Sequence, residues 1–209
     1  MMSLQRVSAI IFCAWSLVSP SFADFIVLMG GGSGSPTTGD QFEGVANEWA
    51  THPVLEIPGL QMSARTTDAT HTLNANKDEF GINSDIVGEN YEAFDYGEVM
   101  ELYFDKDVEL SLLDFNRFES GDCFVLEVEG SDPLEIENQN LSSGINDTYN
   151  FAKALRVSAG TTIRFYVRSD SGAVGMDGIG LQVVPEPMAA TLISLTGISL
   201  LVVRRFSGR

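Results

Sequence analysis

The stretch of sequence that decides the fold class is Thr161-Thr162-Ile163-Arg164-Phe165-Tyr166-Val167-Arg168. Its apolar residues Ile163, Phe165 and Val167 alternate with Arg164 and other polar or amphipathic residues, so the two kinds of side chain point to opposite sides of an extended chain. A period of two is typical of an antiparallel strand that buries one face and exposes the other. The sequence therefore predicts a half-buried strand here.

Segments of the same kind lie before and after this one. We expect strands at residues 99–104, 108–115, 124–128, 154–157 and 179–184, and weaker strands at 60–65 and 70–74. Turn residues such as Asp105-Lys106-Asp107 and Gly130-Ser131-Asp132-Pro133 separate them. Apart from a helical turn expected near residues 42–49, long helical periodicity is absent. Many short strands with turns between them predict an all-β fold, a single β-sandwich of jelly-roll type.

We assign this sandwich to residues 41–184 and expect a flexible Gly/Ser-rich segment at residues 24–40. The N-terminus ahead of that segment has the pattern of a signal peptide. One positive charge precedes an apolar run at residues 7–18, Pro20 ends the run, and Ser21-Phe22-Ala23 supplies small residues at the two positions that signal peptidase reads. We expect cleavage between Ala23 and Asp24. The alternative is an uncleaved anchor that continues into residues 25–29.

The C-terminus carries a second targeting pattern. Pro185-Glu186-Pro187 ends the sandwich at Val184, because proline lacks an N–H donor and has a fixed φ. A largely apolar run of 16 residues, 188–203, follows, and as a helix it would span about 24 Å, a little short of the usual span of about 20 residues. Arg204 and Arg205 then favour a cytoplasmic C-terminus.

An exported body followed by Pro-Glu-Pro, a short apolar helix and arginines resembles the PEP-CTERM proteins, a family of Gram-negative surface proteins. The resemblance covers residues 184–205 and is weaker in the body, at Leu73-Asn74-Ala75 and Gly81-Ile82-Asn83-Ser84. It implies processing by an exosortase, a transient anchor in the inner membrane, and final placement at the cell surface or in the extracellular matrix, associated with exopolysaccharide. The alternative is an ordinary single-pass anchor.

The body between the two targeting segments is strongly acidic. One acid and four arginines of the chain lie outside residues 24–184, which leaves 28 Asp and Glu against 8 Lys and Arg and a net charge of −20. Nucleic acid is excluded as a partner, because phosphate contacts need clustered Lys and Arg. Cys13 lies in the expected signal peptide, so Cys123 is the single cysteine of the body, and its apolar surroundings in sequence predict a buried core position.

Sequence motifs for catalysis are absent. His52 and His71 are the two histidines, and no nucleophile elbow or metalloprotease helix accompanies them. His52 precedes Pro53 in a segment expected to be a loop, and His71 lies in an expected strand. We therefore expect a protein that is not an enzyme. A secreted hydrolase that uses one of these histidines as a base is the alternative.

Calcium is the candidate cofactor. Asn74, Asn76 and Asp78 stand at positions 1, 3 and 5 of a loop whose position 12 is Asp85. Carboxylate and amide oxygens are the ligands that Ca²⁺ takes, although the glycine of an EF-hand is missing here. Two interpretations stay open: an irregular structural calcium site, or a polar turn exposed to solvent.

Aromatic residues raise the question of carbohydrate binding. The candidates for stacking on sugar rings are Trp49, Tyr91, Tyr96, Tyr149 and Tyr166, and Trp49 could equally fill the core. The leading hypothesis is a non-enzymatic exported surface or matrix protein sorted through its C-terminal motif. The second hypothesis is a calcium-assisted carbohydrate-binding module.

Overall fold

The computed structural model describes residues 25–30, 36–75, 79–84, 93–142, 147–168 and 172–185. Within them it has twelve strands and two short 3-10 helices, so the fold is all-β. The strands are β1 (Phe25–Leu28), β2 (Ala50–Pro53), β3 (Gln61–Thr66), β4 (Thr72–Ala75), β5 (Phe80–Asn83), β6 (Val99–Phe104), β7 (Val108–Arg117), β8 (Cys123–Val128), β9 (Leu134–Glu137), β10 (Asp147–Val157), β11 (Ile163–Val167) and β12 (Gly175–Val183). The helices are η1 (Gly39–Phe42) and η2 (Asn138–Asn140).

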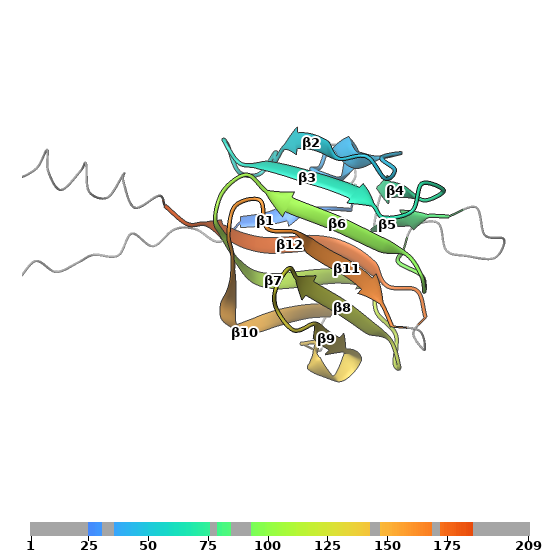
Figure 1. Cartoon of the computed structure of the whole chain (residues 1–209). Helices are drawn as coiled ribbons and strands as arrows, with labels where there is room; N and C mark the ends of the chain where they lie inside the picture. Colours follow the sequence, from blue (N-terminus) through green and yellow to red (C-terminus); the bar gives the residue numbers. More distant parts are fainter. Residues whose placement is uncertain are drawn as a thin grey trace, which may run out of the picture.

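The strands form two antiparallel sheets that stack face to face (Figure 1). The β6 sheet has the order β2-β3-β6-β11-β8-β9. The β7 sheet has the order β10-β7-β12-β5-β4, and β1 also pairs with β12. From β5 onward every connection except β8–β9 passes from one sheet to the other. Neighbours in a sheet are therefore often far apart in sequence.

The predicted alternation in residues 161–168 is confirmed in β11. Ile163, Phe165 and Val167 are buried, whereas Arg164 points outward and is exposed. The strands expected at 60–65, 70–74, 99–104, 108–115, 124–128 and 179–184 correspond to β3, β4, β6, β7, β8 and β12, with ends that differ by up to a few residues. Residues 154–157 form the last part of the longer strand β10.

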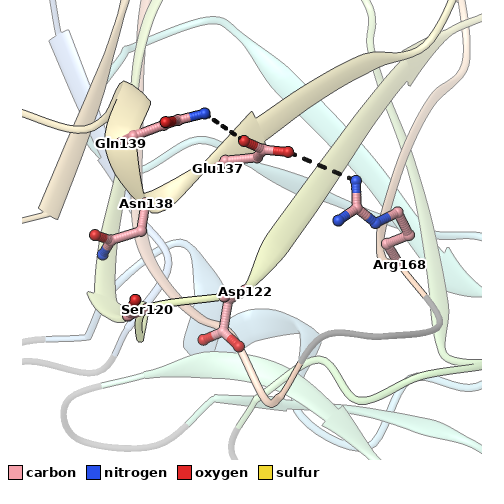
Figure 2. Close-up of a pocket in the computed structure, with 7 residues that line it drawn as sticks. Ser120, Asp122, Glu137, Asn138, Gln139 and Arg168 are labelled. Atoms are coloured by element: carbon pink, nitrogen blue, oxygen red, sulfur yellow. Dashed lines mark hydrogen bonds and ion pairs between the residues drawn. The ribbon is translucent and has the colours of Figure 1, made fainter.

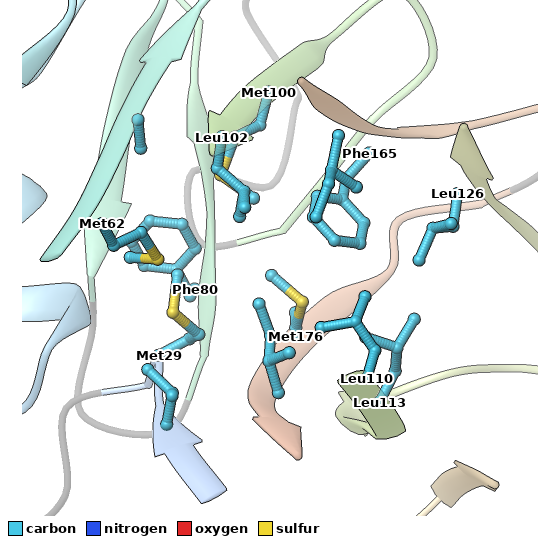
Figure 3. Close-up of a cluster of buried hydrophobic side chains, with 14 of the residues drawn as sticks. Met29, Met62, Phe80, Met100, Leu102, Leu110, Leu113, Leu126, Phe165 and Met176 are labelled. Carbon is cyan, nitrogen blue, oxygen red and sulfur yellow. The ribbon is translucent and has the colours of Figure 1, made fainter. Parts of the chain in front are cut away.

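The core lies between the two sheets. Met62, Leu102 and Phe165 project from the β6 sheet toward Phe80 and Met176 of the β7 sheet (Figure 3). Phe124 of β8 packs edge-on against Phe94 and Phe115 and stacks with Phe165, with ring centroids 5.1–5.8 Å apart. Burial of these large aromatic and aliphatic side chains is the main stabilising contribution to the fold.

The expected flexible segment at residues 24–40 is wrong for the part that the structure describes. Residues 25–28 form β1, which pairs with β12 from Phe25 opposite Leu181 to Leu28 opposite Gly178. Val27 and Met29 are fully buried in the core, and Thr37, Thr38 and Gly39 are buried as well. The alternation of buried Val27 with exposed Ile26 and Leu28 explains the strand. Its position beside the predicted signal peptide made it resemble the continuation of an apolar targeting run.

The segment around each histidine also differs from expectation. His52 does not lie in a loop but in the edge strand β2, opposite Met62 of β3. Pro53 is tolerated there because an edge strand does not need every N–H donor. His71 lies just ahead of β4 and not within a strand. The short strands β5 and β9 add two strands that the strand pattern of the sequence did not predict.

The last strand ends at Val183, and the N–H of Val184 donates to the carbonyl of Asp107. Pro185, the last described residue, is exposed. The other residues predicted to act in targeting, Ala23, Asp24, Glu186, Pro187, Arg204 and Arg205, lie outside the described residues. In the part of the chain that the structure describes, no helix has the length and apolar character needed to cross a membrane.

Candidate ligand-binding face

The outer face of the β6 sheet carries a cluster of charged and aromatic side chains. Antiparallel register places Arg164 of β11 between Glu101 of β6 and Glu127 of β8. The same register places Arg65 of β3 on the other side of Glu101. Because residues opposite each other on one face of a sheet have neighbouring Cβ atoms, these four side chains form one row across four strands.

Glu101 is the centre of this row. Only 4% of the residue is exposed, although it lies on the outer face. Its Oε1 accepts a hydrogen bond of 2.8 Å from Nε of Arg164, and its Oε2 accepts bonds of 2.9 and 2.7 Å from Nε and Nη2 of Arg65. Burial of the carboxyl opposes its ionisation, but the hydrogen bonds from Arg164 and Arg65 outweigh burial and lower the pKa of Glu101.

Arg65 and Arg164 are more exposed to solvent than the Glu101 carboxylate that binds them. The side chain of Arg164 is 49% exposed and that of Arg65 34% exposed. Nη1 of Arg164 lies 3.6 Å from Oε1 of Glu127. No described residue accepts a hydrogen bond from Nη1 of Arg65 or Nη2 of Arg164. These N–H groups are therefore available to a molecule bound at the surface.

Trp49 extends this face toward the edge of the sheet. The Arg65 guanidinium carbon lies 4.5 Å from the centroid of the Trp49 ring, and the Tyr103 ring packs edge-on at 4.8 Å. Arg65 is thus held by Glu101 on one side and by a cation–π contact on the other. Trp49 is 36% exposed, so it neither fills the core nor stands free in solvent.

Two adjoining depressions lie along β11 and share Glu127 and Arg164. The larger, of about 450 Å³, is lined by Arg65, Glu101, Glu127, Glu129, Gly130, Thr162 and Arg164. The smaller, of about 300 Å³, is lined by Thr67, Val99, Glu127, Arg164 and Tyr166. We call the two together the β11 groove. Thr162, Arg164 and Tyr166 are spaced by two residues and lie along it, which gives a length of about 13 Å.

Tyr166 closes one end of the β11 groove. Burial raises the pKa of Tyr166, and the negative charges of Glu127 and Glu135 raise it further. The phenol is therefore protonated at neutral pH and can donate a hydrogen bond.

A separate depression lies in the same sheet, where β8 begins and β9 ends, and we call it the Asp122 pocket. It has about 300 Å³ and is lined by Ser120, Gly121, Asp122, Glu137, Asn138, Gln139 and Arg168 (Figure 2). Nε2 of Gln139 donates to Oε2 of Glu137 at 2.6 Å, and Nη1 of Arg168 lies 3.7 Å from Oε1 of the same carboxylate.

Asp122 itself is used to hold loops in this pocket. It accepts the N–H of Glu119 at 2.7 Å and the N–H of Gly172 at 2.8 Å. These two hydrogen bonds explain why the carboxylate of Asp122 is placed here.

Cys123 is buried, as predicted, but it does not belong to the core between the sheets. Phe124 and Leu126 face the core, so the alternation of β8 turns Cys123 to the outer side. There it lies beneath Arg168 and Glu135, whose Nη1 and Oε2 are 2.9 Å apart, with its sulfur 3.9 Å from Oε2 of Glu135.

The predicted carbohydrate residues do not form one cluster. Trp49 lies beside Tyr103 near one end of β6. Tyr96 is 65% exposed in the turn that precedes the other end of β6. Tyr91 lies outside the described residues. Trp49 therefore joins residues that the sequence analysis did not nominate.

Asn74 lies in β4, opposite Gly81 of β5. The other predicted calcium ligands, Asn76, Asp78 and Asp85, lie outside the described residues. Among the described residues there is no group of three or more His, Cys, Asp and Glu side chains that could hold a metal ion.

The two histidines lie in different surroundings. His52 packs edge-on against Phe42 with ring centroids 5.0 Å apart. His71 lies beside β4 of the other sheet, and its carbonyl accepts the hydroxyl of Thr66 at 2.9 Å. A hydrolase that uses either one stays a prediction.

Sequence reasoning missed Arg65, Glu101 and Arg164 as site residues. The alternation predicted that Arg164 points away from the core. It could not show that the three residues are neighbours, because that depends on the pairing of β3, β6 and β11. Comparisons of this chain with protein-family models, with curated proteins and with solved structures found no match.

Proposed function

We propose that this chain is an exported surface or extracellular-matrix protein, associated with exopolysaccharide and sorted through its C-terminal motif by an exosortase. The observation that carries the proposal is the order of parts in the tail: Pro185-Glu186-Pro187, the apolar run 188–203, and Arg204-Arg205. The run is a little short of the usual transmembrane span of about 20 residues. This length suits the transient anchor that we propose, and the arginines favour a cytoplasmic end.

The geometry of the sandwich supports this arrangement. Phe25, the first described residue, lies opposite Leu181, close to the end of β12 at Val183. The described chain therefore starts and stops at the same end of the β7 sheet. A tether attached at that end leaves the β6 sheet and its outer face accessible to the matrix.

The test is fractionation of cells with and without the exosortase. We expect the full-length chain to stay in the inner-membrane fraction without the enzyme, and a shortened chain to reach the surface or medium with it. A Pro185→Ala/Pro187→Ala variant should be retained in both strains, because it lacks the motif. Equal retention of the wild-type tail in both strains would overturn the proposal.

A second candidate function is a calcium-assisted carbohydrate-binding module, with the sandwich of jelly-roll type. The repeated passage of the chain between the two sheets supports the jelly-roll proposal. The half-exposed Trp49 beside Tyr103 and Arg65 favours carbohydrate binding. A glycan array measured with and without chelator tests this function.

A further inference from the structure

We propose that the β11 groove is a binding site for a neutral oligosaccharide. This inference rests on the second candidate function and specifies its location and its class of ligand. It assigns the recognition of sugar hydroxyls to Arg65, Arg164 and Glu127, with Tyr166 at one end.

The first step is the supply of hydrogen-bond donors. Nη1 of Arg65 and Nη2 of Arg164 have no acceptor among the described residues, and both arginines line the groove. Glu101 holds Arg65 through Nε and Nη2 and Arg164 through Nε. Because Glu101 is buried, the donors are fixed in direction before a ligand arrives, and little conformational entropy is lost on binding.

The second step is the supply of acceptors beside those donors. The carboxylate of Glu127 lies in both parts of the groove, and its side chain is 30% exposed. Glu129 lines the larger part. A sugar hydroxyl accepts one hydrogen bond and donates another, so vicinal hydroxyls suit a surface that sets arginine donors beside glutamate acceptors.

The third step is charge, which selects among possible ligands. The larger part of the groove holds two arginines and the three glutamates 101, 127 and 129. The site therefore has a net charge of about −1 within a strongly acidic body, and it disfavours phosphates, sulfates and uronates. A neutral polyol chain incurs no such repulsion.

The fourth step is shape. An open groove of about 13 Å along β11 suits a short oligosaccharide better than a single sugar. Tyr166 offers a phenol O–H and a ring at one end, and Trp49 supports Arg65, which lies in the same row across the strands as Arg164. Amphipathic rings of this kind combine an apolar surface with a polar tip, as sugar rings also do.

The experiment is isothermal titration calorimetry with the full chain in mild detergent. The probes are neutral hexasaccharides of glucose, mannose and galactose, with hexagalacturonate as the anionic counterpart. We expect at least one neutral probe to bind and hexagalacturonate to bind at least tenfold more weakly. Glu127→Gln removes a charged acceptor and should weaken the neutral complex about tenfold. Tyr166→Phe should weaken it less.

Two variants serve as matched controls. Glu109→Gln changes a carboxylate of the β7 sheet, which does not contain the groove. Its register neighbours in that sheet are Arg156 and Gln182. Tyr96→Phe changes an exposed tyrosine that does not line the groove. Neither should alter affinity, and circular dichroism should show that all variants fold.

Three outcomes separate the location from the function. If a neutral probe binds the wild type but Glu127→Gln and Tyr166→Phe bind it equally well, the location is wrong and carbohydrate binding stands. If only hexagalacturonate binds, the proposed ligand class is wrong. If no glycan binds in buffer with calcium, both this site and the second candidate function fail, while the sorting proposal is unaffected.

Discussion

Glu101 shows how a charged residue can be buried on the outer face of a sheet. Two arginines from neighbouring strands cover the carboxylate and give it three hydrogen bonds. Burial of a carboxylate without partners would cost several kcal/mol. The two arginines both cover Glu101 and supply the hydrogen bonds that make its burial possible. The N–H groups of Arg65 and Arg164 that do not bond to Glu101 then remain available for binding.

Glu101→Gln should destabilise the protein by about 2 kcal/mol at pH 7, because two arginines lose their charged acceptor but are partly solvated. Glu127→Gln is the control. Its carboxylate is 3.6 Å from Arg164 and more exposed, and it should change the free energy of unfolding by less than about 0.5 kcal/mol. Urea denaturation measures both. Equal losses in the two variants would contradict the central role of Glu101.

The contribution of Glu101 should also depend on pH. Its pKa in the folded protein lies below the ordinary value of 4.5, so the folded state favours the ionised carboxylate. The stabilisation is therefore fully present above pH 4.5 and is lost as pH falls through the lowered pKa. The stability difference between wild type and Glu101→Gln should be constant from pH 5 to pH 8 and narrow below pH 4.5. A difference that widens in acid would contradict this assignment.

At the scale of elements, β1 shows that the sandwich begins close to the predicted cleavage point. Val27 and Met29 contribute two fully buried side chains to the core, and the backbone of β1 pairs with β12 over four residues. Signal peptidase would have to leave this strand intact for the sandwich to keep both contributions. Cleavage after Ala23 does so.

Val27→Ala should lower the free energy of unfolding by about 2 kcal/mol, since it removes two buried methyl groups and leaves a cavity. Ile26→Ala is the neighbouring control. Ile26 is 45% exposed, and its truncation should cost less than about 0.5 kcal/mol. Urea denaturation measures the free energy of unfolding of both variants, and the comparison holds if their m-values equal that of the wild type. A negligible effect of Val27→Ala would show that β1 does not belong to the folded unit.

At the scale of the whole molecule, the net charge of −20 on residues 24–184 dominates. Like charges destabilise a compact state through mutual repulsion, and salt screens them. We expect the melting temperature to rise when NaCl is increased from about 10 mM to about 150 mM, where the Debye length falls from about 30 to about 8 Å. A melting temperature that falls over this range would show that attractive ion pairs outweigh repulsion.

The calcium prediction can be tested with the same measurement, the melting temperature in defined salt. If Asn74, Asn76, Asp78 and Asp85 hold Ca²⁺, CaCl₂ should raise the melting temperature above the value in MgCl₂ at the same ionic strength, because a ligand that binds the folded state stabilises it. Asp78→Asn should remove the difference, whereas Asp132→Asn, in the exposed turn after β8, should keep it. Identical melting in the two salts would exclude the site.

The sequence by itself determined which residues form most strands, which side of the strand at residues 161–168 faces the core, and where the last strand ends. These properties are local. A period of two and the stops at Pro185 and Pro187 depend only on neighbouring residues. The all-β class and the outward direction of Arg164 follow from them. The strand β1 was missed because its apolar residues follow directly on a segment predicted to be a signal peptide.

Only the tertiary structure decided which outward side chains meet. Arg65 and Arg164 are 36 and 63 positions from Glu101 in the chain, yet both bond its carboxylate. That juxtaposition depends on the order and register of β3, β6 and β11, which are set by packing between two sheets and not by any local pattern. The alternation therefore predicted the outward direction of Arg164, and strand pairing placed it beside Glu101 and Arg65 in a groove.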